Sequence, residues 1–111
     1  GVVHGTQAFL PHLRASGDGH VVNTSSLFGL VAMPPQSAYN ATKWGLLGLS
    51  HALHAELRER NVRVSAVVAG GMKTPFLLDR FPGIDETKLQ EPINVARAVR
   101  WASASRAMAA G

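Results

Sequence analysis

Apolar and polar positions alternate with two different periods along the 111-residue chain. Residues 2–13 repeat apolar side chains every three or four positions, which is typical of one face of a helix. The β-branched run at 20–26 is typical of a buried strand, and the run at 61–68 alternates before it becomes apolar. Helical spacing returns at 37–60 and 93–109. The pattern therefore predicts helix, strand, helix, strand and helix, in that order.

Glycine and proline separate these segments. Gly17 and Gly19 end the first helix, and Pro34-Pro35 prevents a new helix before position 36 or 37. Residues 69–76 are predicted to form a glycine loop, and 77–92 a mobile connection. Two strands joined by a long helix cannot form a tight hairpin, so we expect a right-handed crossover and parallel pairing. This is an α/β pattern, and because two strands are too few for a stable open sheet, half a domain is expected to be absent.

Composition excludes several classes of protein. The chain is 46% hydrophobic and 16% charged, and its net charge of +4 comes from scattered residues rather than a basic face, which argues against nucleic-acid binding. No apolar run approaches the roughly 20 residues of a membrane-spanning helix, and nothing resembles a signal peptide. The absence of cysteine excludes disulfides, thiolate nucleophiles and cysteine-ligated zinc. We expect a soluble cytoplasmic protein that does not bind membranes.

The long predicted helix carries two stripes. One is leucine-rich and is expected to cover a sheet; it comprises Leu46, Leu49, Leu53 and Leu57. The other, roughly opposite, holds only small residues: Ala41, Gly45, Gly48, Ala52 and Ala55. Glycine costs about 1 kcal/mol of helix propensity relative to alanine, so its presence suggests a close approach by another backbone. The small stripe is either a solvent-facing or intrachain packing surface, or the interface of a homodimer or homotetramer.

Tyr39 and Lys43 lie four positions apart, so they share one face of the long helix. Ser26 lies thirteen residues before Tyr39, at the exit of the first strand, where ligands bind in parallel α/β sheets. Phenols have a reference pKa of about 10, which a nearby ammonium lowers by Coulomb attraction. A serine hydroxyl can hold a carbonyl oxygen beside the phenol. Such a trio suits proton exchange with an alcohol or carbonyl compound, and a cofactor must supply the hydride.

Three segments resemble the short-chain dehydrogenase/reductase family. The segment "HVVNTSSLFG" looks like its strand and catalytic serine, "YNATK" matches its Tyr-x-x-x-Lys motif, and "AGGMKT" is similar to its Pro-Gly-x-Val-x-Thr loop. Nearly the whole chain fits the C-terminal half of that family's domain. The resemblance implies that residues 1–111 form a single partial domain, the catalytic half of a Rossmann-like doubly wound parallel sheet whose dinucleotide-binding half is missing.

The resemblance also implies roles for individual residues. Tyr39 would be the general acid/base, and Ser26 would orient and polarise the substrate oxygen. Lys43 would favour the phenolate and hydrogen-bond the nicotinamide ribose. The nicotinamide end of the cofactor would be bound by Tyr39 and Lys43 and lined by Gly70, Met72 and Thr74. The implied activity is interconversion of a secondary alcohol and a ketone with NAD or NADP, between which the sequence does not discriminate.

Two features depart from the family pattern. Ala69 stands where the family usually has proline, which restores an N–H and frees the backbone. The glycine-rich dinucleotide loop and the active-site asparagine that usually lies upstream are absent from the sequence. Because pyrophosphate is held by backbone groups of that loop, we expect the isolated chain neither to bind the cofactor tightly nor to turn over.

Other interpretations of the same residues remain open. Ser25 and Ser26 could simply end a strand through turn hydrogen bonds, and Lys43 could be a solvated charge. His51 and His54 share a helical face but lack a third ligand, so no metal site is expected. The loop residues Phe28, Met33, Phe76, Leu77 and Phe81 could form an apolar substrate wall or close the core. The alternative function is a non-catalytic association module that uses the small stripe.

Overall fold

The computed structural model describes residues 1–104. Its order of elements confirms the predicted alternation of helices and strands. The helices are α1 (Val2–Ser16), α2 (Ser37–Leu57), α3 (Pro75–Arg80) and α4 (Pro92–Ala104), and the strands are β1 (Gly19–Ser26) and β2 (Val62–Ala69). Single 3-10 turns η1, η2 and η3 occupy Leu27–Gly29, Arg58–Arg60 and Glu86–Lys88. The predicted final helix extends to residue 109, and its last five positions lie outside the described residues.

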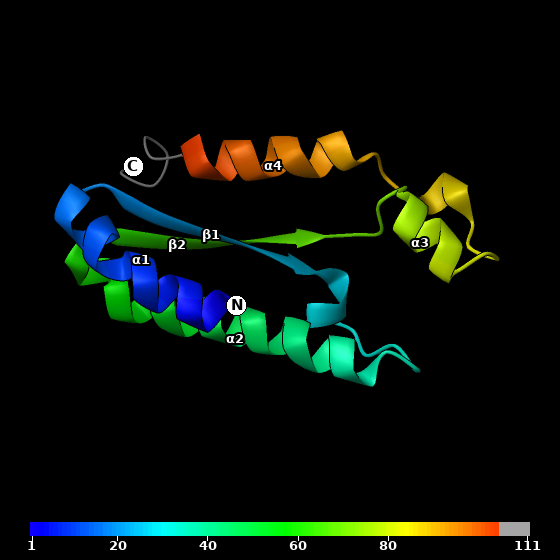
Figure 1. The fold of residues 1–111 in the computed structure, drawn as a ribbon, viewed down its shortest axis with the longest axis horizontal. Coiled ribbons are helices and arrows are strands. Elements are labelled where there is room, and N and C mark those ends of the chain that lie inside the picture. The colour runs from blue at the N-terminus through cyan, green and yellow to red at the C-terminus, as the bar shows by residue number, and fades with distance from the viewer. Residues whose placement is uncertain (105–111) are drawn as a thin grey trace.

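The two strands pair in parallel, as the crossover argument predicts. The register aligns Gly19 with Val62 and Ser26 with Ala69, so both strands end at the same edge of the sheet. Helices α1 and α2 lie on one face and α4 on the other, while α3 lies beyond the carboxyl end of β2 (Figure 1). The chain is therefore an α/β protein with a partial Rossmann-like arrangement. Within the described residues no helix is both long and apolar enough to cross a membrane.

The hydrophobic core lies between the sheet and helices α1 and α2. Leu57, Val62 and Val64 form a buried cluster, against which partly buried side chains pack: Leu10, Leu13, Val21 and Leu53. The predicted leucine stripe is only partly correct. Leu46 and Leu49 are half-buried, whereas Leu47 and Ser50 are buried together with Leu57. The helix is rotated so that a polar residue, Ser50, faces the sheet, because Asn23 on β1 hydrogen-bonds its hydroxyl.

Helix α3 corrects the prediction of a mobile connection after residue 76. Thr74 caps its N-terminus, since its hydroxyl oxygen accepts a hydrogen bond from the backbone N–H of Leu77 at 3.2 Å. Pro75 occupies the first turn, where its fixed φ suits a helix and its missing N–H costs nothing. These are ordinary helix-start signals that the neighbouring glycines obscured.

The small-residue stripe of α2 packs against nothing within the described part of the chain. All five of its residues are exposed, and a Cβ built on Gly45 or Gly48 would meet no atom within 4 Å. Trp44 on the same helix is 51% exposed. No segment of residues 1–104 therefore covers the stripe, and packing within this part of the chain does not explain it.

Gly29 is required by a close approach of η1 to α2. A Cβ at this position would lie 2.7 Å from Leu47 Cδ1 and 2.9 Å from the carbonyl oxygen of Lys43. Because the carbonyl cannot move without distorting α2, we expect Gly29→Ala to destabilise the protein by about 1–3 kcal/mol. Thermal unfolding measures this loss, with Gly83→Ala as the control, because a Cβ on Gly83 meets nothing within 4 Å. Equal melting temperatures for the two variants would contradict the close approach.

His20 is expected to make stability depend on pH. Burial, aided by the positive charge of Arg63, lowers the pKa of His20 below 6.5, while the Ser103 backbone and the Asp18 carboxylate oppose the shift. Its Nε2 lies 2.8 Å from Ser65 Oγ. The unfolded chain therefore takes up a proton first as pH falls below about 6.5, so stability is present above that pH and is lost below it.

The measurement for His20 is the melting temperature between pH 7.5 and 5.5, taken within about one pH unit of the reference pKa of histidine. The native protein is expected to lose more stability across this range than the His20→Gln variant. The variant keeps the four exposed histidines, so the difference between the two proteins reports His20 alone. Parallel pH profiles of the two proteins would contradict the argument.

Candidate active site

Ser26 lies at the end of β1, and its side chain already has a structural partner. Its Oγ accepts a hydrogen bond from the backbone N–H of Phe28 at 3.2 Å and thereby caps η1. Among residues 1–104 the hydroxyl hydrogen has no acceptor, so it can be donated to a ligand. The parallel register aligns Ser26 with Ala69, so the glycine loop that follows β2 starts at the same edge of the sheet.

Tyr39 and Lys43 lie on the first two turns of α2. The Lys43 ammonium is 5.7 Å from the centroid of the Tyr39 ring and donates a hydrogen bond to the carbonyl of Thr24 at 3.3 Å. The Phe28 ring packs edge-on against Tyr39, with centroids 5.8 Å apart and an interplanar angle of 90°. Tyr39 is 42% exposed, so its phenol is accessible. Lys43 is therefore held between β1 and Tyr39, and Phe28 connects Tyr39 to Ser26.

Two buried polar residues near these side chains escaped prediction as site-forming groups. Ser25 is 2% exposed, and its hydroxyl donates to the carbonyl of Lys43 at 3.3 Å, so it docks α2 on β1 rather than forming a turn. Asn40, directly after Tyr39, is 9% exposed and hydrogen-bonds three peptide groups of the preceding loop. No pattern in the sequence marked Asn40 as buried, because its helical neighbours include Gln36, Ser37 and Lys43.

The glycine loop after β2 is held by Gln90. The N–H of Gln90 donates to the carbonyl of Gly71 at 3.0 Å, and the N–H of Lys73 donates to the carbonyl of Gln90 at 2.8 Å. Within residues 1–104 no hydrogen bond uses the N–H or C=O of Met72, although Met72 is the residue that the bridge pairs with Gln90. The Thr74 hydroxyl accepts from Leu77 and keeps its own hydrogen. Both groups are of the kind that can hydrogen-bond a carboxamide.

A depression of about 500 Å³ lies between the start of α2 and α3. It is lined by Pro35, Gln36, Phe76, Asp79, Arg80 and Phe81. Gln36 occupies the N-cap position of α2, three residues before Tyr39, so the depression borders the start of the helix that carries the phenol. Phe76, which is 75% exposed, and Phe81 belong to its lining and are not core residues, in keeping with an apolar wall.

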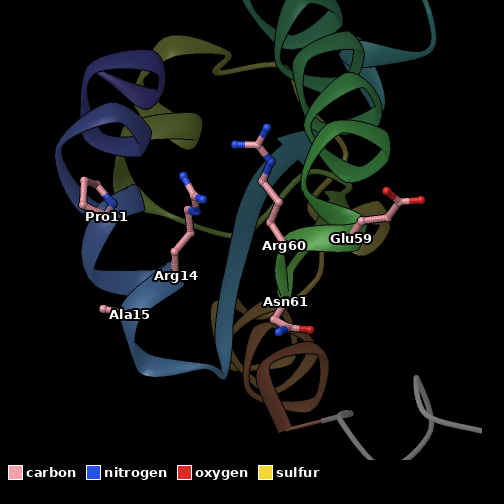
Figure 2. A pocket seen from close by; sticks show the side chains of 6 residues that line it. All are labelled: Pro11, Arg14, Ala15, Glu59, Arg60 and Asn61. Carbon is pink, nitrogen blue, oxygen red and sulfur yellow. The ribbon is translucent and has the colours of Figure 1, made fainter.

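A second depression, of about 570 Å³, lies at the opposite end of the strands. Pro11, Arg14 and Ala15 of α1 line it together with Glu59, Arg60 and Asn61, which precede β2, and the two arginine side chains extend toward the space between these segments (Figure 2). It is distant from Ser26 along β1 and has no part in the candidate active site. Residues 1–104 contain no group of three side chains that could hold a metal ion.

The family is established by comparison with known proteins. The family model described as short chain dehydrogenase matches residues 1–84. The chain therefore belongs to the short-chain dehydrogenase family, whose relatives include named oxidoreductases.

Individual relatives agree with this family. SadH, a Mycobacterium tuberculosis protein named as an oxidoreductase, is 58% identical over 76 residues, which are 67% of this chain and 28% of SadH. The 2,5-dichloro-2,5-cyclohexadiene-1,4-diol dehydrogenase LinX of Sphingobium indicum is 33% identical over 111 aligned positions, which cover 93% of this chain and 44% of LinX. The chain thus spans less than half the length of either relative.

A solved structure agrees with the fold. An Escherichia coli CFT073 short-chain dehydrogenase crystallised with NADPH is 34% identical, with a TM-score of 0.77. The match covers 88% of this chain and 40% of that protein.

Proposed function

We propose that this chain is the catalytic half of an NAD(P)-dependent oxidoreductase that interconverts a secondary alcohol and a ketone. The observation that carries the proposal is the position of the Lys43 ammonium, 5.7 Å from the Tyr39 ring centroid, at the strand edge where Ser26 ends β1. Membership in the short-chain dehydrogenase family supports it. We assign residues 1–111 to one partial Rossmann-fold domain of a cytoplasmic enzyme.

Each side chain has one proposed task. Ser26 donates its hydroxyl hydrogen to the substrate oxygen, because its oxygen already accepts the N–H of Phe28. Tyr39 gives a proton to that oxygen in reduction and removes it in oxidation. Lys43 stabilises the phenolate of Tyr39 and binds the ribose. A bound nicotinamide would supply or accept the hydride at the substrate carbon.

The cofactor is proposed to be NAD or NADP, held at its nicotinamide end by this chain. The N–H and C=O of Met72 and the hydroxyl of Thr74 are suitable for the carboxamide, and Gly70 lets the ring approach the loop. The E. coli neighbour crystallised with NADPH supports a nicotinamide nucleotide without selecting between the two forms. The substrate is proposed to be small and apolar, since Phe76 and Phe81 line the nearby depression.

A thermal-shift titration with NAD(H) and NADP(H) tests the proposal. It is performed on the full-length product of the gene that encodes this chain and on residues 1–111 alone. Because a ligand that binds the folded state raises the unfolding free energy, we expect a shift in the full-length protein. The isolated chain is expected to show none. A full-length protein that ignores both nucleotides would contradict the proposal.

The small-residue stripe of α2 is proposed to form a homodimer or homotetramer interface. Gly45 and Gly48 are open to another backbone, and Trp44 is exposed beside them. We expect Ala52→Glu to reduce the full-length protein to a smaller assembly, because it places a charge in the close contact. Light scattering measures the mass, with Ala96→Glu on exposed α4 as control. An unchanged mass for Ala52→Glu would exclude this interface.

The second candidate function is a non-catalytic association module. The same exposed stripe favours it, since a protein could dock there without any chemistry at Tyr39. A module has no reason to respond to nicotinamide nucleotides, so the thermal-shift titration separates it from the dehydrogenase.

A further inference from the structure

We propose that Asn40 is a positioning residue that fixes the hydroxyl of Ser26 through the backbone of Phe28. The inference rests on the proposed function, because it assigns Asn40 to the accuracy of that reaction. Within residues 1–104 the Asn40 side chain forms no hydrogen bond with the phenol of Tyr39 or with the hydroxyl of Ser26. Its effect is carried by the loop between them.

The Asn40 side chain holds three peptide groups at once. Its Nδ2 donates to the carbonyls of Phe28 and Val31, both at 2.8 Å, and its Oδ1 accepts the N–H of Met33 at 3.0 Å. The amide orientation is unambiguous, because the opposite assignment would direct an oxygen at two carbonyl oxygens. With an exposure of 9%, the side chain makes these bonds out of competition with water.

Phe28 transmits this restraint to the site. Its carbonyl is held by Asn40, and its N–H donates to Ser26 Oγ at 3.2 Å. Phe28 is the middle residue of η1, a single turn that also makes the 2.9 Å bond from the Leu30 N–H to the Leu27 carbonyl. Fixing one peptide group of so short a turn therefore fixes its neighbours, including the N–H that orients Ser26.

No other side chain of the described residues provides this link. The hydroxyl of Ser25 and the ammonium of Lys43 also tie α2 to β1, but they bond Lys43 and Thr24 rather than η1. Without the Asn40 side chain, the segment from Phe28 to Met33 loses three hydrogen bonds, one at each of its ends and one at Val31. It keeps the Phe28–Tyr39 ring contact and the turn bond of η1, which do not hold the carbonyl of Phe28. Ser26 would then sample several positions relative to the substrate oxygen.

The expected result is a loss of turnover. A displacement of about 1 Å in a reacting group can cost as much as about a hundredfold in rate. We expect Asn40→Ala to lower kcat by about ten- to a hundredfold, with the KM for the nicotinamide nucleotide changed by less than about threefold, since binding does not need the Ser26 hydroxyl.

The test is a double-mutant cycle in the full-length protein, which compares native protein, Asn40→Ala, Ser26→Ala and the double variant. If Asn40 acts through Ser26, Asn40→Ala costs less than about threefold once Ser26 is already alanine, because residues that act as a unit are not additive. Independent losses that multiply in the double variant would overturn the inference. Asn40→Ser, which removes the amide without placing a charge against the carbonyls of Phe28 and Val31, repeats the cycle if Asn40→Ala does not fold.

Asn23→Ala is the matched control for general loosening. Asn23 is another buried asparagine, 8% exposed, and its Nδ2 donates to Ser50 Oγ at 2.9 Å in the middle of α2. The Asn23→Ala variant is expected to have a lower melting temperature than the native protein, while its kcat stays within about threefold of the native value. An equal loss of kcat in both asparagine variants, or failure of both Asn40 variants to fold, would make Asn40 merely structural. If Ser26→Ala and Tyr39→Phe leave activity unchanged, the proposed function itself has failed.

Discussion

Replacing Tyr39 with phenylalanine is expected to lower kcat by about 10²–10⁴-fold, the usual contribution of a general acid or base. The substitution removes only the hydroxyl group. The phenylalanine ring can keep the edge-on contact with Phe28, so the packing of the site is preserved. The reaction then loses the group that exchanges a proton with the substrate oxygen. Steady-state kinetics of the full-length protein measure the loss.

The control for Tyr39→Phe is the unfolding of the same variant without cofactor. Tyr39 is 42% exposed and forms no side-chain hydrogen bond in the described residues, so its melting temperature should match that of the native protein. Activity within a few-fold of native in a folded Tyr39→Phe variant would remove Tyr39 from the mechanism.

The second large effect is expected at Lys43. Lys43→Met preserves much of the side-chain length and removes the ammonium that lies between Tyr39 and the carbonyl of Thr24. Both the phenolate and the ribose lose their positive partner, so we expect kcat to fall by at least about a hundredfold and the nucleotide to bind more weakly. Ser26→Ala, in contrast, should lower kcat and leave nucleotide binding nearly unchanged.

Lys88→Met is the charge-matched control for Lys43. Lys88 is exposed on η3, and its ammonium forms no hydrogen bond or ion pair within residues 1–104, so its removal should leave both parameters at native values. Equal behaviour of the two lysine variants would mean that Lys43 is a solvated helix charge, as the simpler interpretation holds.

Much of the fold could be predicted, because along most of the chain the spacing of hydrophobic residues and the positions of glycine and proline indicate the same helices and strands. The β-branched run before Ser26 becomes β1, and Pro34-Pro35 delays α2 until Ser37. The parallel pairing follows from the length of the crossover between the strands. Spacing and side-chain chemistry grouped Ser26, Tyr39 and Lys43, and the family motifs then supplied their individual proposed roles.

The parts that could not be predicted depend on which polar groups become buried. The leucine pattern of α2 placed Leu46 and Leu49 toward the sheet, yet hydrogen bonding between Asn23 and Ser50 turns a polar position inward. Gln90 reaches the glycine loop from twenty positions away, and no local pattern signals such a partner. Asn40 was visible only as part of a motif, because its three loop contacts depend on the folded path of Phe28 to Met33.

Transfer of deuteride from labelled nucleotide tests the central claim most directly. The full-length protein is incubated with NADH or NADPH that carries deuterium at both C4 positions and with a series of small apolar ketones, and the products are examined by mass spectrometry. The account predicts an alcohol with one deuterium on the carbinol carbon, formed by the native protein and nearly absent with Tyr39→Phe. Binding of the nucleotide without any deuterated alcohol, or the same yield from Tyr39→Phe, would contradict it.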